Sequence, residues 1–220
     1  MLKTKNRNIT KKLLILGCGG HAKVVTEIAE SVGFNEFYYH DINTENNKFL
    51  GRDVFHEDIN HYFGYFFVPI GDNFIRERVT KNFQLNNPNS INKTLIHPSS
   101  QISESCSIGE GSVIMPLCVV NSHSQVGSGV IINTHSSIDH DNKIMNFSSI
   151  APGVITGGNV SIGYRTAISL GAIIRNDIEI GPDNVIGASS YINRNITNKK
   201  VVYGSPGREI RTRNIGDKYL

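Results

Sequence analysis

Residues 133–142 contain four ionisable side chains, His135, Asp139, His140 and Asp141, which we expect to share one corner of the fold. A histidine flanked by aspartates can give one ring nitrogen to a carboxylate and keep the other free as a general base near neutral pH. The stretch therefore predicts a catalytic His140 supported by Asp141. Zinc binding by His135, His140 and an aspartate is the competing interpretation, but the spacing of the two histidines fits no standard zinc pattern. We therefore expect no metal.

A second candidate site is the glycine-rich loop G-x-G-x-x-A, which contains Gly17, Gly19 and Ala22. It lies between an apolar run at 13–16, typical of a buried strand, and an amphipathic stretch at 21–32 that predicts a helix. Backbone N–H groups at such a helix N-terminus can bind a phosphate. The alternative is a tight turn with no ligand. The loop alone does not indicate a dehydrogenase, because the second half-domain that normally holds nicotinamide is missing.

Three further features favour ligand binding beside this loop. His21 stands at the start of the predicted helix, where the positive helix end disfavours its protonated form, so it can donate one hydrogen bond to a phosphate or sugar. Asp41 ends the second predicted strand, where a carboxylate can accept hydrogen bonds from a sugar hydroxyl. Gly71, Asp72 and Asn73 follow the third strand, and ligands bind at this edge of an open parallel sheet. The alternative role for Asp72 or Asn73 is an N-cap.

The first 92 residues alternate strands and helices, which predicts a small parallel sheet in a half-size, Rossmann-like α/β domain. The expected strands are 13–16, 37–40 and 65–70, and the expected helices are 21–32 and 74–84. The remaining stretches are read as a polar leader at 1–12, a loop at 42–51 and a linker at 86–92.

The rest of the chain is dominated by a six-residue repeat. Every sixth residue from Ile96 to Ile192 is Ile or Val, with Thr156 as the single exception. Neither a helix nor a plain strand repeats every six residues, whereas a parallel β-helix does. The next residue is often Gly or Asn, as at Gly109 and Asn121, and we expect positive φ there. The fourth residue after each repeat position is usually small, and we expect it to fill the interior.

The chain is thus predicted to divide into an α/β domain at 1–92, a β-helix at 93–197 and a C-terminal tail at 198–220. The tail is expected to form a short helix or to cover the open end of the β-helix, whose exposed strand edge needs protection.

Composition excludes several classes of function. The chain has 220 residues, 39% of them hydrophobic and 19% charged, with a net charge of +3, which is typical of a globular protein. No basic run is interleaved with aromatic residues, so nucleic-acid binding is not expected. No apolar run approaches the roughly 20 residues that span a bilayer. The three cysteines form no C-x-x-C pair, which favours the reducing cytoplasm.

Taken with these motifs, the chain resembles the bacterial sugar acetyltransferases of the left-handed β-helix, hexapeptide-repeat superfamily. It is most similar to the subgroup of bacillosamine-pathway UDP-amino-sugar N-acetyltransferases and sialic-acid O-acetyltransferases. The resemblance covers about residues 13–210. It rests on the glycine loop with His21, on residues 70–73 with Arg76, on residues 133–134, on His140-Asp141, and on residues 157–159.

The resemblance implies a homotrimer in which acetyl-CoA lies between neighbouring β-helices and a nucleotide sugar lies on the N-terminal domain. His140 would be the general base and Asp141 the carboxylate that raises its basicity. The substrate would contact Gly19, Gly20, His21, Asp41, Gly71, Asp72, Asn73 and Asn133. The Gly158 amide would lie near the thioester carbonyl, and Ser149, Leu170 and Ala188 would line the acetyl-CoA groove. Many relatives have histidine at the Ser149 position.

The implied function is acetyl-CoA-dependent N-acetylation of a nucleotide-linked amino-dideoxy sugar, with the 4-amino sugars as the expected class. Transfer would occur directly in a ternary complex with no covalent enzyme intermediate. One alternative keeps the fold and changes the acceptor to a sialic acid or related sugar, which would be O-acetylated. A second alternative is a sugar-binding trimer without catalytic activity. The sequence leaves the nucleotide open among UDP, dTDP and GDP.

Overall fold

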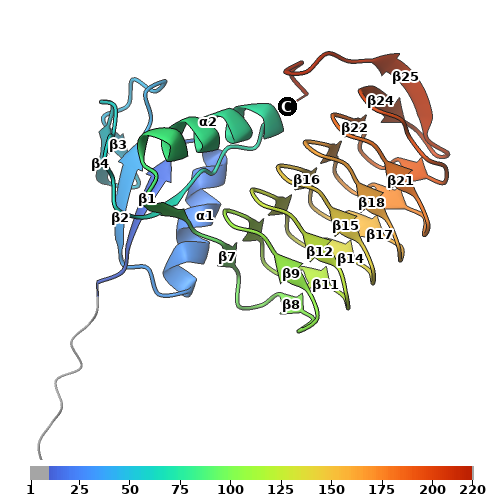
Figure 1. Ribbon diagram of the computed structural model, residues 1–220, viewed down its shortest axis with the longest axis horizontal. Helices are drawn as coiled ribbons and strands as arrows, with labels where there is room; N and C mark the ends of the chain where they lie inside the picture. The colour runs from blue at the N-terminus through green and yellow to red at the C-terminus, as the bar shows by residue number, and fades with distance from the viewer. Residues whose placement is uncertain (1–9, 220) are drawn as a thin grey trace, which may run out of the picture.

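The computed structural model describes residues 10–219, which form an N-terminal α/β part and a long parallel β-helix (Figure 1). The predicted polar leader falls largely on residues 1–9, which lie outside the described residues, and Lys12 already belongs to the first strand. Within residues 10–219, neither helix is long and apolar enough to cross a membrane.

The N-terminal sheet has six strands in the order β3-β4-β2-β1-β5-β6. All neighbouring strands are parallel except β3 and β4. This confirms the predicted parallel sheet and adds three strands to it. The strands are β1 (Lys12–Leu16), β2 (Glu36–His40), β3 (Lys48–Phe49), β4 (Arg52–Phe55), β5 (Gly64–Phe67) and β6 (Ser90–Asn92).

The two helices, α1 (Gly20–Ser31) and α2 (Asn73–Asn86), pack on opposite faces of this sheet. Successive side chains of a strand point to opposite faces. Leu13 and Ile15 of β1 share a core with the buried side of α1, whereas Leu14 and Leu16 share one with Phe83 of α2. Both helices begin just after the carboxyl end of a strand, so the loops before them lie at the same edge of the sheet.

Two expected loops contain strands. The stretch 42–51 was predicted to be a loop, but β3 and β4 form a hairpin whose turn residues Leu50 and Gly51 both have positive φ. A turn with two positive φ angles matches the right-handed twist of paired strands. Such turns are usually recognised by Asn or Asp before Gly, and Leu at this position does not indicate one. The stretch 86–92 was predicted to be a linker, but α2 extends to Asn86 and β6 pairs with β5.

The β-helix has three faces, and neighbouring strands of a face pair in register 18 residues apart, as Val113 does with Ile131, except at the C-terminal end, where Val185 pairs with Val201. Face 1 contains β7 (Leu95–Ile96), β10 (Val113–Ile114), β13 (Ile131–Ile132), β16 (Ser149–Ile150), β19 (Ala167–Ile168), β22 (Val185–Ile186) and β24 (Lys200–Tyr203). Face 2 contains β8 (Gln101–Ile102), β11 (Val119–Val120), β14 (Ser137–Ile138), β17 (Ile155–Thr156), β20 (Ile173–Ile174) and β23 (Tyr191–Ile192). Face 3 contains β9 (Ser107–Ile108), β12 (Gln125–Val126), β15 (Lys143–Ile144), β18 (Ser161–Ile162) and β21 (Glu179–Ile180).

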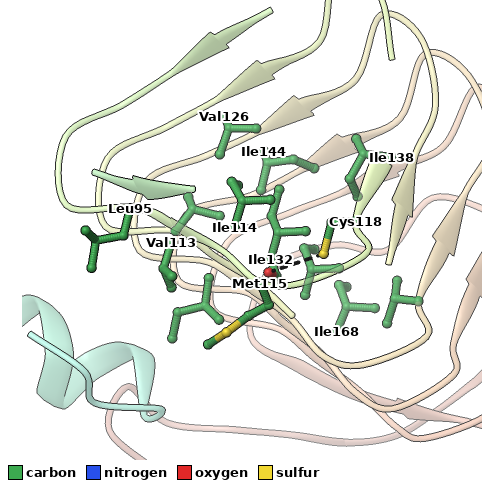
Figure 2. Packing of buried hydrophobic residues seen from close by; sticks show 14 of the residues in the cluster. Leu95, Val113, Ile114, Met115, Cys118, Val126, Ile132, Ile138, Ile144 and Ile168 are labelled. Atoms are coloured by element: carbon green, nitrogen blue, oxygen red, sulfur yellow. Dashed lines mark hydrogen bonds between the residues drawn. The ribbon is translucent and has the colours of Figure 1, made fainter. Parts of the chain in front are cut away.

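The interior of the β-helix confirms the six-residue pattern. The repeat residues from Ile114 to Ile192 are buried, and several of them pack together in Figure 2. The small residues four positions later are buried over most of the array, and their hydroxyls link successive coils. Ser112, for example, donates to the Gly127 carbonyl at 2.7 Å and accepts from the Val130 N–H at 3.0 Å. A buried hydroxyl that both donates and accepts carries little desolvation penalty.

The expected positive φ of the Gly and Asn residues that follow the repeat positions is wrong. Positive φ occurs two residues later, for example at Leu117, Asp141 and Gly153. Glycine is favoured after the repeat position because neighbouring coils come close there. A Cβ on Gly109 would lie 2.5 Å from the Ser128 nitrogen, and one on Gly157 would lie 2.6 Å from the Asn176 nitrogen.

The C-terminal tail contains strands in place of the expected short helix. β24 adds a last parallel strand to face 1, and β25 (Arg208–Thr212) pairs antiparallel with β24. The second expectation, that the tail covers the open end of the β-helix, agrees with Figure 1, where β24 and β25 lie at that end.

Buried polar contacts join the two parts of the chain. Arg76 of α2 is 1% exposed and donates to the carbonyls of Gly129, Phe147 and Ser148 in the β-helix. Beside it, Glu77 pairs with Arg165 at 2.7 Å. These β-helix residues all belong to the corner between faces 3 and 1, so α2 lies along that corner.

Candidate active site

His140 lies on an exposed corner of the β-helix, between β14 of face 2 and β15 of face 3. Its Nδ1 is 2.8 Å from Asp141 Oδ2, and both side chains are more than half exposed. A carboxylate at Nδ1 favours the tautomer that carries its proton there, which leaves Nε2 free to accept a proton. The Asp141 hydrogen bond, with smaller contributions from the charges of Asp139 and Asp177, raises the pKa of His140.

The backbone around His140 is fixed by local hydrogen bonds. Asp139 Oδ1 accepts from the His140 N–H at 2.8 Å, and the His140 carbonyl accepts from the Asn159 N–H at 2.9 Å. The imidazole covers Gly158 of the next coil, where a Cβ would lie 2.5 Å from His140 Nε2. Only glycine at position 158 therefore leaves room for the ring in this position.

The N-terminal part contains a pocket of about 610 Å³ at the carboxyl edge of its sheet. It brings together five of the predicted substrate-binding residues: Gly19, Gly20, His21, Asp41 and Gly71. The glycine loop and the start of α1 form one wall, as the loop pattern predicts for a phosphate site. Its size is in the range of small-ligand pockets.

Asp41 and His21 have different roles within this pocket. Asp41 accepts from the Cys18 N–H and the Asn43 N–H, both at 2.9 Å, so its carboxylate orders the glycine loop. His21 Nε2 is buried and has no hydrogen-bond partner among the described residues. Burial, together with the charge of Arg76, lowers the pKa of His21 to about 4. A neutral His21 that contributes one unpaired nitrogen agrees with the predicted hydrogen bond to a ligand.

Asp72 and Asn73 lie outside the pocket lining. Asp72 is the N-cap of α2 and accepts from the Ile75 N–H at 2.9 Å. Asn73 is 1% exposed, its side chain bonds Arg76 and the Arg165 carbonyl, and its N–H donates to the Tyr219 hydroxyl. The Asp72 side chain thus has the alternative role considered for it, that of an N-cap, whereas the Asn73 side chain joins α2 to the β-helix.

The expectation that His135 and His140 share one corner is wrong. The strand β14 separates them, so His135 lies at the corner between faces 1 and 2, and His140 at the corner between faces 2 and 3. Within residues 10–219, no three His, Cys, Asp or Glu side chains gather as metal ligands. Asn133 lies on the His135 corner, and its side chain accepts from the Thr134 N–H at 2.8 Å.

The predicted acetyl-CoA residues lie at three different places on the β-helix. Gly158 is beneath His140, whereas Leu170 and Ala188 are exposed on successive coils at the corner between faces 1 and 2. Ser149 is on face 1, beside the Tyr219 side chain. One protomer therefore does not bring these four residues together.

The pocket and His140 also lie on different sides of one protomer. Leu95 and Val113, whose side chains project outward from face 1, belong to the same core as α1, and α2 follows the corner between faces 3 and 1. His140 occupies the corner opposite face 1 in the triangular cross-section. A sugar held by the N-terminal pocket would have to cross the prism to reach His140 of the same chain.

Several pocket residues were missed by the sequence analysis. Asn43, Asp58 and Asn60 come from loops, and Asn82 and Asn86 from one side of α2. Isolated polar residues in loops and on a helix surface resemble ordinary solvent-exposed residues, and of these five only Asn43 closely follows a predicted strand. Together they add hydrogen-bonding groups to the pocket lining.

Comparison with known proteins finds relatives of the N-terminal domain and of the longer chain. Residues 12–83 match the family model of the PglD N-terminal domain. The GDP-perosamine N-acetyltransferase of Escherichia coli O157:H7 is 31% identical over 124 residues, which are 56% of this chain and 55% of that protein. The chain thus matches about half the length of this curated relative.

Solved structures extend the similarity to nearly the whole chain. The acetyltransferase domain of PglB from Neisseria gonorrhoeae FA1090 is 32% identical, with a TM-score of 0.85 over 91% of this chain and 100% of that domain. The same domain in complex with acetyl coenzyme A gives 31% identity and a TM-score of 0.85 over 92% of this chain and 100% of that domain. PerB from Caulobacter crescentus, in complex with CoA and GDP-perosamine, is 28% identical, with a TM-score of 0.85 over 91% of this chain and 98% of PerB. The chain therefore belongs to the family of acetyltransferases that combine a PglD N-terminal domain with a parallel β-helix.

Proposed function

We propose that this protein transfers the acetyl group of acetyl-CoA to the amine of a nucleotide-linked amino-dideoxy sugar, with a 4-amino sugar as the expected acceptor. The observation that carries the proposal is the exposed His140–Asp141 pair, whose Nδ1–Oδ2 distance is 2.8 Å. The similarity to proteins that bind CoA with GDP-perosamine, or acetyl coenzyme A alone, supports this choice of substrates.

In the proposed reaction the sugar amine attacks the thioester carbonyl carbon, so that a C–N bond forms as the C–S bond breaks. His140 Nε2 accepts the proton lost by the amine, and the imidazolium returns a proton to the departing CoA sulfur, which leaves as the thiol. Asp141 holds the proton on Nδ1 and stabilises the imidazolium. The Gly158 N–H is proposed to donate to the carbonyl oxygen as negative charge develops there.

The N-terminal pocket is proposed to bind the nucleotide diphosphate through Gly19, Gly20, His21 and Gly71. Asp41 orders the loop, and Asn133 is proposed to contact the sugar. Acetyl-CoA is proposed to contact Ser149, Leu170 and Ala188. The division into a nucleotide-binding part at 1–92, an acetyltransferase part at 93–197 and a tail at 198–220 belongs to this proposal.

We further propose a homotrimer with shared active sites. Because the pocket and His140 lie on different sides of one protomer, a site that uses both needs a second copy. The residue before each repeat position points outward from its face. On face 2 these residues include Ile155 and Ile173, which are 49% and 46% exposed, and Leu170 lies at the edge of the face and is 57% exposed. The outward column of face 3 is polar, with Gln125, Lys143 and Glu179. Face 2 is therefore the better candidate for contact between copies, and His140 lies at its border.

A cytoplasmic location completes the proposal. Cys18, Cys106 and Cys118 are all free thiols, as a reducing compartment requires.

The test is an assay of CoA release with acetyl-CoA and a panel of UDP-, dTDP- and GDP-linked 3-amino and 4-amino dideoxy sugars, with free sialic acid as the O-acetylation control. We expect turnover with at least one nucleotide-linked amino sugar and none with sialic acid. His140→Ala should lower kcat by roughly 10²–10⁴ with little change in KM. Turnover of sialic acid alone, or a near-normal rate for His140→Ala, would overturn the proposed acceptor or base, respectively.

A further inference from the structure

The coils of the β-helix are joined by a regular hydrogen bond at each corner. From His97 to Arg175, the residue after a repeat position donates its N–H to the carbonyl of the repeat residue one coil later, with one exception. Asn121 thus donates to the Ile138 carbonyl at 2.9 Å, and Gly157 to the Ile174 carbonyl at 2.8 Å.

Asp139 breaks this rule. Its N–H donates to the Thr156 hydroxyl oxygen at 3.1 Å instead of the Thr156 carbonyl. The pairing of β14 with β17 is correspondingly reduced to Ser137 with Ile155, while Thr156 still pairs normally with Ile174 on its other side. The change is therefore confined to the step between these two coils.

The irregular hydrogen bond coincides with the one exception in the sequence repeat. Among the repeat positions from Ile96 to Ile192, Thr156 is the only residue that is neither Ile nor Val, and it is 2% exposed. Valine has nearly the same shape, so packing alone does not explain the hydroxyl. A buried hydroxyl costs free energy unless it is hydrogen-bonded, and here its partner is the backbone of Asp139.

Both residues of this hydrogen bond, Asp139 and Thr156, are close in sequence to groups that contact His140. Asp139 accepts the His140 N–H at 2.8 Å and the Asn121 side-chain amide at 3.2 Å through Oδ1. Two residues after Thr156, Gly158 supports the ring from the next coil. The spacing between these coils therefore sets the position of the ring relative to Gly158.

We propose that Thr156 is a positioning residue for the reaction, a role that rests on the proposed function of His140. The Thr156 hydroxyl accepts the hydrogen bond of the Asp139 N–H in place of the Thr156 carbonyl. This shifts the coil of Gly158 relative to the coil of His140, and the shift positions the imidazole over Gly158. An aliphatic residue at 156 would return the Asp139 N–H to the carbonyl, restore the regular ladder and shift His140 against Gly158. Small displacements of a catalytic group have large effects on rate.

The test compares Thr156→Val with Thr156→Ser, which keeps the hydroxyl. We expect Thr156→Val to lower kcat by about 10-fold or more with little change in either KM, and Thr156→Ser to stay within about threefold of the wild type. The ring signals of His140, followed by NMR of histidine-labelled protein without substrate, should move in Thr156→Val and return in Thr156→Ser.

Thr166 provides a matched control at the corner between faces 3 and 1. It is fully buried, donates to the Gly181 carbonyl at 2.7 Å and accepts from the Asn184 N–H at 3.1 Å. Thr166→Val should lower Tm but leave kcat and the His140 signals unchanged. If Thr156→Val does not fold, Thr156→Ala and Thr156→Ser form the comparison, since both shorten the side chain and only serine keeps the hydroxyl.

The outcomes separate this inference from the proposed function. Wild-type kcat and unchanged His140 signals in folded Thr156→Val or Thr156→Ala would overturn the positioning role, even if His140→Ala abolishes turnover. A normal rate for His140→Ala would instead remove the base itself. Equal losses in Thr156→Val and Thr166→Val would show a general packing effect and would also overturn the positioning role.

Discussion

The imidazole of His140 rests on the backbone of Gly158, so that a Cβ at position 158 would lie 2.5 Å from Nε2. The proposed base is thus seated by a residue one coil away that contributes no side chain. Its exposed position on the corner is compatible with a defined ring orientation because the Asp141 carboxylate holds Nδ1 from the other side.

Gly158→Ala should displace the ring and lower kcat by about 10²-fold, because the methyl group occupies the place of the imidazole. Gly163→Ala is the control, since its Cβ would lie 2.6 Å from the Gly181 carbonyl oxygen, at the corner between faces 3 and 1 and away from the imidazole. Steady-state kinetics and thermal unfolding distinguish the two effects. Gly163→Ala should lower Tm and keep kcat; an unchanged kcat in folded Gly158→Ala would contradict the predicted contact.

Asp141→Asn should change the pH dependence of the reaction. The Asp141 carboxylate raises the pKa of His140, so its removal lowers that pKa. Because the base acts in its neutral form, the acidic limb of kcat/KM should move to lower pH, while the plateau falls as the imidazolium loses its partner. Asp53→Asn, on an exposed position of β4, is the control and should leave the profile unchanged. A limb that moves to higher pH would refute the assignment.

His21 should make the protein less stable as the pH falls. Burial lowers its pKa to about 4, whereas in the unfolded chain it binds a proton near pH 6.5. Between these values the unfolded state binds more protons, so the His21 contribution to the free energy of unfolding falls as the pH decreases from about 6.5 to 4. Urea unfolding of wild type and His21→Gln at several pH values measures this contribution. A difference between the two proteins that is independent of pH would exclude a buried neutral His21.

Arg76→Met should destabilise the junction between the two parts of the chain. It leaves the buried carbonyls of Gly129, Phe147 and Ser148 without the Arg76 donor, and we expect a loss of about 3 kcal/mol in the free energy of unfolding. The exposed Arg78 of the same helix is the control, and Arg78→Met should change stability by less than about 0.5 kcal/mol. Similar urea midpoints for the two variants would show that Arg76 is not essential to the junction.

The β-helix was the part of the fold that the sequence predicted best. A narrow prism favours branched side chains, nearly all of them Ile or Val, at every sixth position, so the requirement is visible in the chain without tertiary information. The glycines after these positions were recognised for the wrong reason, because contact between coils, unlike φ preference, depends on the three-dimensional stacking. Gly109 and Gly157 illustrate this difference.

The N-terminal part was predicted less completely. β3, β4 and β6 are short and lack a clear alternating pattern, and their pairing depends on neighbours distant in sequence. At the candidate site, adjacent residues such as His140 and Asp141 were predictable as a pair. The separation of His135 from His140, and the burial of Asn73 and Arg76 at the junction, depend on how the coils and helices pack, which spacing alone does not encode. The catalytic and binding roles of the site residues stay predictions.

The 18-residue register of the β-helix limits how such a chain can change length during evolution. Insertion of one residue within a strand would move the residues after it out of register with the coil before, exchanging interior for surface positions and breaking pairs such as Val113 with Ile131. Insertion or loss of a whole coil would preserve the interior and change only the length of the β-helix before its C-terminal strands β24 and β25. Length variation among homologues should therefore occur in steps of one coil, or be confined to bulges at the corners.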